Sequence, residues 1–263
     1  MLRSFLKRFR KAGPLRIGLC AQRLYLSDGL SEGREIEIKG PESGAPEGGA
    51  SAWQAAVERL PEVLAPYEGR QASVVVADQF VSYALLPWSD TLKTHAQWLA
   101  LARHRFCAIH GPLAAEWEIR FAETAPAGAR LACAAERGLI EALAEKFAAS
   151  RTELVSVQPF LVAAYNRVRA LTGGSCWLLV EEPGRLTLAL IQRGLWIAIR
   201  SRRMDEHWRR ALPQIIERES AFLGLEEPCT RVIVFAQGSF DADEHEAFRT
   251  EALSYRELTL EAA

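Results

Sequence analysis

The segment 175–203 (SCWLLVEEPGRLTLALIQRGLWIAIRSRR) constrains the fold of this chain more than any other feature. It holds three short runs of apolar and branched residues, which favour β-strands, at Cys176–Val180, Leu186–Ile191 and Leu195–Ile199. Residues 181–184 (EEPG) predict a turn, because proline fixes φ and glycine accepts a positive φ. Residues 192–194 (QRG) predict the next turn, and a helical pattern follows from Asp205. The order is therefore strand, strand, strand, helix.

Size and composition describe an ordinary globular protein. A chain of 263 residues is long enough for one large domain or two compact lobes. The net charge of −1 argues against a general affinity for nucleic acid. The five cysteines are widely spaced and form no C-x-x-C pair, which argues against zinc and redox sites and predicts buried thiols in a reducing compartment.

The N-terminus has the pattern of a short basic amphipathic helix, predicted within residues 1–13. Its apolar residues recur at helical spacing, and its other face is basic without any acid. The apolar set is Leu2, Phe5, Leu6 and Phe9, and the basic set is Arg3, Lys7, Arg8, Arg10 and Lys11. Such a helix is suited to an anionic membrane surface or to a partner, although packing on its own protein is the alternative. No apolar run reaches the about 18 residues of a membrane-spanning helix.

The rest of the chain repeats the order of the central segment. The first half predicts strands at Pro14–Cys20, Arg23–Ser27 and Glu35–Lys39, a helix over 53–64 interrupted near Pro61, a strand at Ser73–Ala77, a helix at Arg137–Ser150 and a strand at Leu154–Val157. After its three strands, the second half predicts a helix at Asp205–Leu223, a strand at Arg231–Phe235, a helix at Asp241–Glu251 and a strand at Tyr255–Leu258. This is a repeat of structure rather than of residues.

Additional elements lie between the fourth strand and the following helix of the first half. They are expected as a strand at Phe80–Trp88, a helix at Leu92–Phe106 and strands at Glu116–Phe121 and Leu131–Ala135. A further helix is expected to open at Pro159, since proline is tolerated in the first turn of a helix.

This ordered set resembles the actin-like ATPase superfamily, in which two ribonuclease-H-like lobes face each other. More closely, it resembles PilM of the type IV pilus inner-membrane platform and the cytoplasmic part of the type II secretion L protein. The resemblance rests on Leu15–Ser27 and Trp177–Arg200 as the two lobe hairpins, Leu131–Tyr165 as a strand-helix-strand-helix unit, and Val232–Ser239 as a late strand and turn. It implies an α/β actin-like fold with lobes at 14–172 and 173–263 and a small inserted α/β subdomain at about 80–122.

The positions that match the nucleotide motifs of that superfamily depart from them. The first phosphate turn, Asp-x-Gly in the family, falls on Gly18 to Cys20, and the second places its Asp and Gly on Glu181 and Pro183. The paired glycines of the adenosine turn become Gln237-Gly238. Proline has no N–H to offer phosphate, and each lost contact costs a few kcal/mol, so we expect no nucleotide cofactor, no metal and no catalytic residue.

The resemblance then implies a docking scaffold on the cytoplasmic face of a bacterial inner membrane. PilM binds the cytoplasmic tail of a bitopic partner, PilN, and the L protein holds the secretion ATPase. We therefore expect a PilN-like tail as partner and an assembly ATPase as a second one. The alternative is a divergent ATPase or phosphotransferase in which Glu181 holds Mg²⁺.

Two surface features complete the sequence-based expectations. Trp88 and Trp98 lie in the inserted segment and are predicted to form a partner-binding surface. Arg200, Arg202 and Arg203 are expected to lie at a solvated strand end, with an anion site as the alternative.

Overall fold

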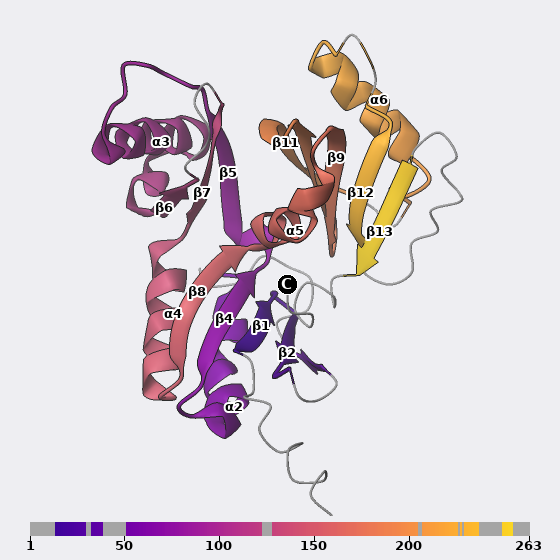
Figure 1. The fold of residues 1–263 in the computed structure, drawn as a ribbon. Coiled ribbons are helices and arrows are strands. Elements are labelled where there is room, and N and C mark those ends of the chain that lie inside the picture. The colour runs from indigo at the N-terminus through magenta and orange to yellow at the C-terminus, as the bar shows by residue number, and fades with distance from the viewer. Residues whose placement is uncertain are drawn as a thin grey trace, which may run out of the picture. The chain divides into compact units, whose positions relative to one another are not determined.

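The computed structural model describes residues 14–29, 33–38, 51–122, 128–204, 207–225, 227 and 229–236, and the backbone of 249–254. The chain divides into two compact units (Figure 1). Unit 1 comprises the described parts of 1–75 and 143–157, and unit 2 those of 76–142 and 158–258. The division passes through β4 (Gln71–Val76), α4 (Arg137–Ala149) and β8 (Glu153–Pro159).

Unit 1 is built on a five-stranded sheet with the order β3-β2-β1-β4-β8. Its first three strands are β1 (Leu15–Leu19), β2 (Arg23–Ser27) and β3 (Arg34–Glu37), and short helices α1 (Gln54–Glu58), α2 (Leu60–Leu64) and η2 (Ala65–Tyr67) precede β4. β1 and β2 are antiparallel and place Gly18 opposite Tyr25. Buried aliphatic residues on both strands anchor this sheet in the core of the unit.

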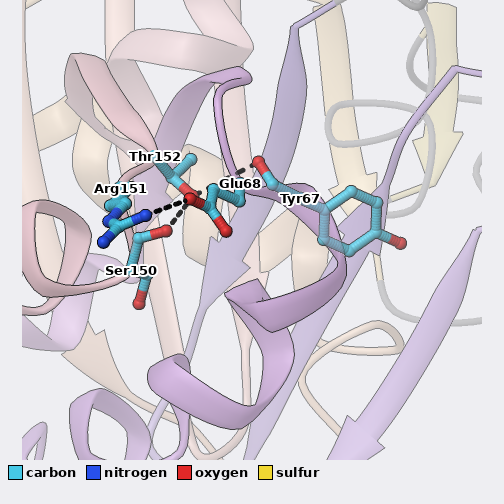
Figure 2. A network of polar contacts seen from close by, with 5 residues as sticks. All are labelled: Tyr67, Glu68, Ser150, Arg151 and Thr152. Atoms are coloured by element: carbon cyan, nitrogen blue, oxygen red, sulfur yellow. Dashed lines mark hydrogen bonds and ion pairs between the residues drawn. The ribbon is translucent and has the colours of Figure 1, made fainter.

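A polar network ties the loop after α4 to the segment before β4 (Figure 2). Thr152 is only 3% exposed, and its hydroxyl lies 3.4 Å from the carbonyl oxygens of both Tyr67 and Ser150. The Arg151 guanidinium forms an ion pair of 2.8 Å with Glu68, and the Arg151 carbonyl accepts a 2.9 Å hydrogen bond from the Gly69 amide. These contacts hold the segment before β4 against the segment before β8.

Unit 2 contains a second five-stranded sheet with the order β11-β10-β9-β12-β13, which has the same topology as the first sheet. Its strands are β9 (Ser175–Glu182), β10 (Arg185–Gln192), β11 (Leu195–Arg203), β12 (Arg231–Ala236) and β13 (Arg249–Ser254). Its helices are α5 (Phe160–Val168), followed by η5 (Arg169–Leu171), and α6 (Leu212–Phe222). β9, β10 and β11 form an antiparallel meander, and β12 joins β9 in parallel.

The inner residues of this sheet and α6 share one core. Trp177, Leu179 and Leu188 pack with Ile215 and Ile216 of α6. Successive residues of a strand point to opposite faces, so the even-numbered residues of β9 face away from this core. α5 contacts β9, and its Phe160 packs edge-on against Phe235 of β12. The sheet is therefore buried on both faces, which explains why its strands are continuous apolar runs.

The additional elements form a small three-stranded sheet with the order β5-β7-β6, also in unit 2. They are η3 (Asp78–Phe80), β5 (Val81–Leu86), α3 (His95–His110), η4 (Pro112–Glu116), β6 (Glu118–Phe121) and β7 (Arg130–Ala135). α3 begins with a capping box in which the Thr94 hydroxyl accepts from the Gln97 amide and the Gln97 side chain accepts from the Thr94 amide. Because β7 pairs with both β5 and β6, this small sheet extends past the predicted end at residue 122.

Most of the predicted elements are confirmed, including the repeated order of three strands. Two are corrected. Glu181 and Glu182 are the last residues of β9 rather than part of a turn, because both pair with β10. The last strand is β13 at Arg249–Ser254, so it begins where the sequence predicts the end of a helix and lies before the predicted strand at 255–258. The predicted helix over 1–13 lies outside the described residues.

The core of the inserted segment supplies a first test. Phe106 of α3 is fully buried, whereas Ile109, one turn later, is 62% exposed. We expect Phe106→Ala to lower the free energy of unfolding of unit 2 by about 3–5 kcal/mol, because the loss of the ring leaves a cavity. Chemical denaturation measures this effect.

The matched control is Ile109→Ala in the same helix. Its side chain contributes little to the core, so its effect is expected to stay within about 0.5 kcal/mol. Equal losses from both substitutions would show that the packing of α3 described above is incorrect.

Candidate functional site

The candidate site lies at the end of β9, where the sequence places the second phosphate turn. Pro183 and Gly184 form a two-residue turn between β9 and β10, and Gly184 has a φ of 69°. The Gly184 carbonyl accepts a 3.1 Å hydrogen bond from the Met204 amide. Pro183 has no N–H, so this turn offers phosphate fewer backbone donors than a glycine-rich turn does.

Glu181 is bound by side chains of its own unit. Its Oε1 accepts a 2.9 Å hydrogen bond from the indole Nε1 of Trp208, and its Oε2 lies 2.8 Å from Nη2 of Arg209. Trp208 is 3% exposed and belongs to the core between the sheet and α6. Both carboxylate oxygens therefore have charged or polar partners, and a metal ion at Glu181 would have to displace them.

Glu182 points to the opposite face of the sheet and is 4% exposed. Its Oε1 accepts a 2.9 Å hydrogen bond from the backbone amide of Asp78, at the start of η3. Asp78 is fully buried, and its Oδ1 accepts from the Tyr83 hydroxyl at 2.5 Å and from the Leu161 amide at 3.0 Å. Two carboxyl groups from segments 104 residues apart are thus buried next to each other.

The second oxygen of each carboxyl group, Oδ2 of Asp78 and Oε2 of Glu182, is buried and has no hydrogen-bond partner within the described part of the chain. Burial raises the pKa of Asp78 to about 6 and that of Glu182 to about 8, and the charge of Asp78 contributes to the raised pKa of Glu182. Arg185 opposes both shifts, as do the hydrogen bonds to the two carboxylates. Near neutral pH the pair therefore retains about one proton, which relieves the repulsion between two buried charges.

Sequence reasoning missed Asp78, Tyr83 and Glu182 as one cluster. Asp78 lies directly after an apolar strand, and Glu182 lies beside the position that matches the family motif. Each carboxylate ends or follows an apolar run, which is a weak signal for burial, and only the approach of distant segments shows which group it contacts.

At the first predicted phosphate turn, residues 18–20, the backbone groups are used in the β1–β2 hairpin. Gly18 lies inside β1, and the amide of Cys20, which is 6% exposed, donates a 3.0 Å hydrogen bond to the Arg23 carbonyl. This amide closes the β1–β2 hairpin. The third position, Gln237-Gly238, lies outside the described residues, and so do the membrane-facing residues predicted in the N-terminal helix.

The predicted partner surface is corrected in part. Trp98 is 3% exposed, packs in the core of the inserted segment and lies under the guanidinium of Arg130 at 4.3 Å, so it does not form a surface. Trp88 is 48% exposed, and its role in partner binding stays a prediction.

The arginine cluster extends along β11, which runs to Arg203. Arg202 and Arg200 both form ion pairs with Glu219 of α6, which is 1% exposed. These contacts compensate a buried charge and give the two arginines a structural role, which weakens the alternative of an anion site.

No group of three or more potential metal-binding side chains occurs among the residues that the structure describes. Within the same residues, no helix combines the length and hydropathy needed to cross a membrane.

Comparison with solved structures decides the fold. The chain is similar to a PilM-PilN type IV pilus biogenesis complex, with a TM-score of 0.65 and 14% identity over 94% of this chain and 90% of the other. It is also similar to the cytoplasmic domain of EpsL, an inner-membrane component of the type II secretion system of Vibrio cholerae, with a TM-score of 0.59 and 9% identity over 93% and 91% of the two chains. A Bacteroides thetaiotaomicron protein with an actin-like ATPase fold matches with a TM-score of 0.54 and 9% identity over 91% and 90%.

The chain has the actin-like ATPase fold. No protein-family model matches the sequence, and no curated protein matches it. The predicted resemblance to PilM and to the L protein of type II secretion is confirmed as a structural one. At the end of β9, where the sequence resemblance predicts the second phosphate turn, Glu181 is bonded within its own unit and is followed two residues later by Pro183.

The buried pair predicts an unusual dependence of stability on pH. Both carboxyl pKa values are raised, so the folded protein binds more protons than the unfolded chain between about pH 4 and pH 8. The free energy of unfolding should therefore fall as pH rises through this range, by at most about 1.4 kcal/mol per pH unit for each proton. Denaturant titrations from pH 5 to pH 8.5 measure the slope.

Substitution of Glu182 identifies the source of that slope. Glu182→Gln keeps the acceptor for the Asp78 amide and replaces the retained proton by an amide N–H, so we expect a flatter pH profile and a gain in stability at pH 8. Glu145→Gln, at a side chain that is 74% exposed, is the control and should leave the slope unchanged. A profile for Glu182→Gln identical to that of the parent protein would refute the shared-proton account.

Proposed function

We propose that this protein is a non-catalytic actin-like scaffold of a type IV pilus or type II secretion-like assembly platform at a bacterial inner membrane. The observation that carries the proposal is the state of Glu181, the residue that would hold Mg²⁺ in an active member. Its two oxygens bind Trp208 and Arg209 within the same unit. The similarity to the PilM-PilN complex and to cytoplasmic EpsL supports the choice of assembly system.

In this proposal the protein lies on the cytoplasmic side, and its N-terminal segment helps to hold it at the membrane. Its main partner is the cytoplasmic tail of a PilN-like bitopic protein, and an assembly ATPase is a second partner. The similarity to a PilM-PilN complex supports a PilN-type partner. Trp88, which is 48% exposed, stays a candidate for the contact surface.

The edge of the unit 1 sheet offers a place where an extended tail can bind as an added strand. β8 forms one edge of that sheet, and Val155 in its middle is 45% exposed. The opposite edge, β3, carries the sequence REIE, and charges on an edge strand oppose pairing with another chain. β8 (ELVSVQP) has a single charged residue at its first position, so it is the better template for strand addition.

A test of ATP binding distinguishes a non-catalytic scaffold from an active ATPase. A ligand at about 100 times its Kd stabilises a fold by about 2.7 kcal/mol. We expect no shift of the thermal unfolding midpoint with millimolar ATP and Mg²⁺, because Glu181 is already bonded and Pro183 offers no N–H. A clear shift that disappears in Glu181→Ala would support the rival ATPase instead.

The docking prediction uses a synthetic peptide of the cytoplasmic tail of a PilN-like bitopic protein. We expect Val155→Lys to weaken peptide binding about tenfold or more, because a charge on the edge of β8 opposes strand addition. Fluorescence anisotropy of a labelled peptide measures the affinity.

Ile197→Lys, at a 39% exposed position on the edge strand β11 of the other sheet, is the matched control and should bind the peptide normally. Absence of any peptide binding by the parent protein would count against the docking function. Equal effects of both substitutions would show that β8 is not the docking edge.

A further inference from the structure

The outward face of α3 is basic and apolar and lacks acids. The chain contains no Asp or Glu from Thr91 to Ala115, a range that includes all of α3 and most of η4. Lys93 and Arg105 are exposed within it, and three histidines lie at its helical positions. Surface helices normally mix charges of both signs, as α6 does with exposed Glu217 and Arg218.

Two large aliphatic side chains protrude at the C-terminal end of α3. Ile109 is 62% exposed and Leu113, at the start of η4, is 79% exposed. The core of the inserted segment uses other residues of this helix, namely Trp98, Ala102 and Phe106. Arg105 lies one turn before Ile109 and therefore on the same side of α3. Neither aliphatic side chain belongs to that core, and both are exposed beside the basic residues of this face.

The cations around this end of the helix outnumber the acids. Arg103 donates a hydrogen bond to the Ala115 carbonyl, and Arg137 donates one of 3.2 Å to the Glu116 carbonyl. Both arginines therefore lie beside η4. The carboxylate of Glu116 is the nearest acid beyond the acid-free range on this side, and Arg137 lies next to its backbone. The local charge stays positive.

We propose that the C-terminal end of α3 and the start of η4, with Arg105, Ile109 and Leu113 at its centre, bind an anionic phospholipid surface. We call these three residues the α3 patch. Aliphatic residues that protrude beside basic ones are the composition of an interfacial helix, which inserts its apolar side chains at the headgroup boundary while its cations bind lipid phosphates. Trp88 is exposed in the loop between β5 and α3, and tryptophan is enriched at membrane interfaces.

Charge complementarity favours an anionic phospholipid surface as the ligand of the α3 patch. The net charge of the whole chain is −1, so it has no general attraction to polyanions such as nucleic acid. A local positive patch that also exposes two aliphatic side chains matches a surface that is both anionic and apolar beneath. This inference does not depend on the docking of a tail peptide, and it adds a second membrane contact to the one predicted in residues 1–13.

The test is vesicle co-sedimentation of the full chain at lipid concentrations below saturation. Vesicles of phosphatidylcholine with phosphatidylglycerol are compared with vesicles of phosphatidylcholine alone. We expect partitioning onto the anionic vesicles only, and a decrease of the partition coefficient by about tenfold or more in the double variant Ile109→Ser, Leu113→Ser, because two inserted side chains are lost. Arg105→Gln should give a decrease of about fivefold.

The matched control is Phe222→Ser at the end of α6, where the side chain is 73% exposed but lies among charges of both signs. It should bind vesicles like the parent protein. Parent-like binding by the double variant, an equal loss in Phe222→Ser, or equal binding to neutral vesicles would each overturn the proposal.

The affinity for the tail peptide is measured on the same variants to separate the two proposals. The double variant should bind the peptide normally, because its substitutions lie in unit 2 and the proposed docking edge lies in unit 1. A loss of peptide binding without any loss of vesicle binding would reassign the α3 patch to a protein partner. A loss of vesicle binding alone would support the lipid site, whatever the fate of the docking edge.

Discussion

The packing around β9 depends on the contacts of two consecutive glutamates, Glu181 and Glu182, at the end of that strand. Because successive side chains of a strand point to opposite faces of the sheet, Glu181 and Glu182 lie on opposite faces. Glu181 meets Trp208 and Arg209 on the face covered by α6, and Glu182 meets the Asp78 backbone on the other face. The sequence resemblance predicts the second phosphate turn of the actin-like superfamily at this position. Here both side chains are used to hold neighbouring segments in place.

That use has an electrostatic consequence. Glu182 and Asp78 are both buried, and their second oxygens find no partner in the described part of the chain. Such a pair is stable only if it keeps a proton, and the raised pKa values of both groups express this. The arrangement costs stability at high pH, and its value to the protein is the link it forms between η3 and β9, which are far apart in sequence.

Much of the fold could be predicted because short apolar runs rich in branched residues are bounded by turn residues. The segment 175–203 gave three strands in the right places, and the repeated order of elements gave two sheets of one topology. The ends of strands were harder, since Glu181 and Glu182 are polar in type yet stay paired with β10. The surface prediction for Trp98 is wrong because its indole packs with Ala102 and Phe106 in the core of the inserted segment.

The site was predictable only in its position. The resemblance to the superfamily motif identified Glu181 and Pro183 as departures, but it did not identify the groups that bind Glu181 and Glu182. Those partners come from residues 208–209 and from 78–83, and their approach to β9 depends on tertiary packing.

The most direct measurement is a crystal structure of the protein grown with a non-hydrolysable ATP analogue and Mn²⁺, whose anomalous signal marks the metal. The account predicts no manganese signal at the end of β9, with Glu181 still bonded to Trp208 and Arg209. A manganese ion bound to Glu181 beside an ordered triphosphate would contradict it.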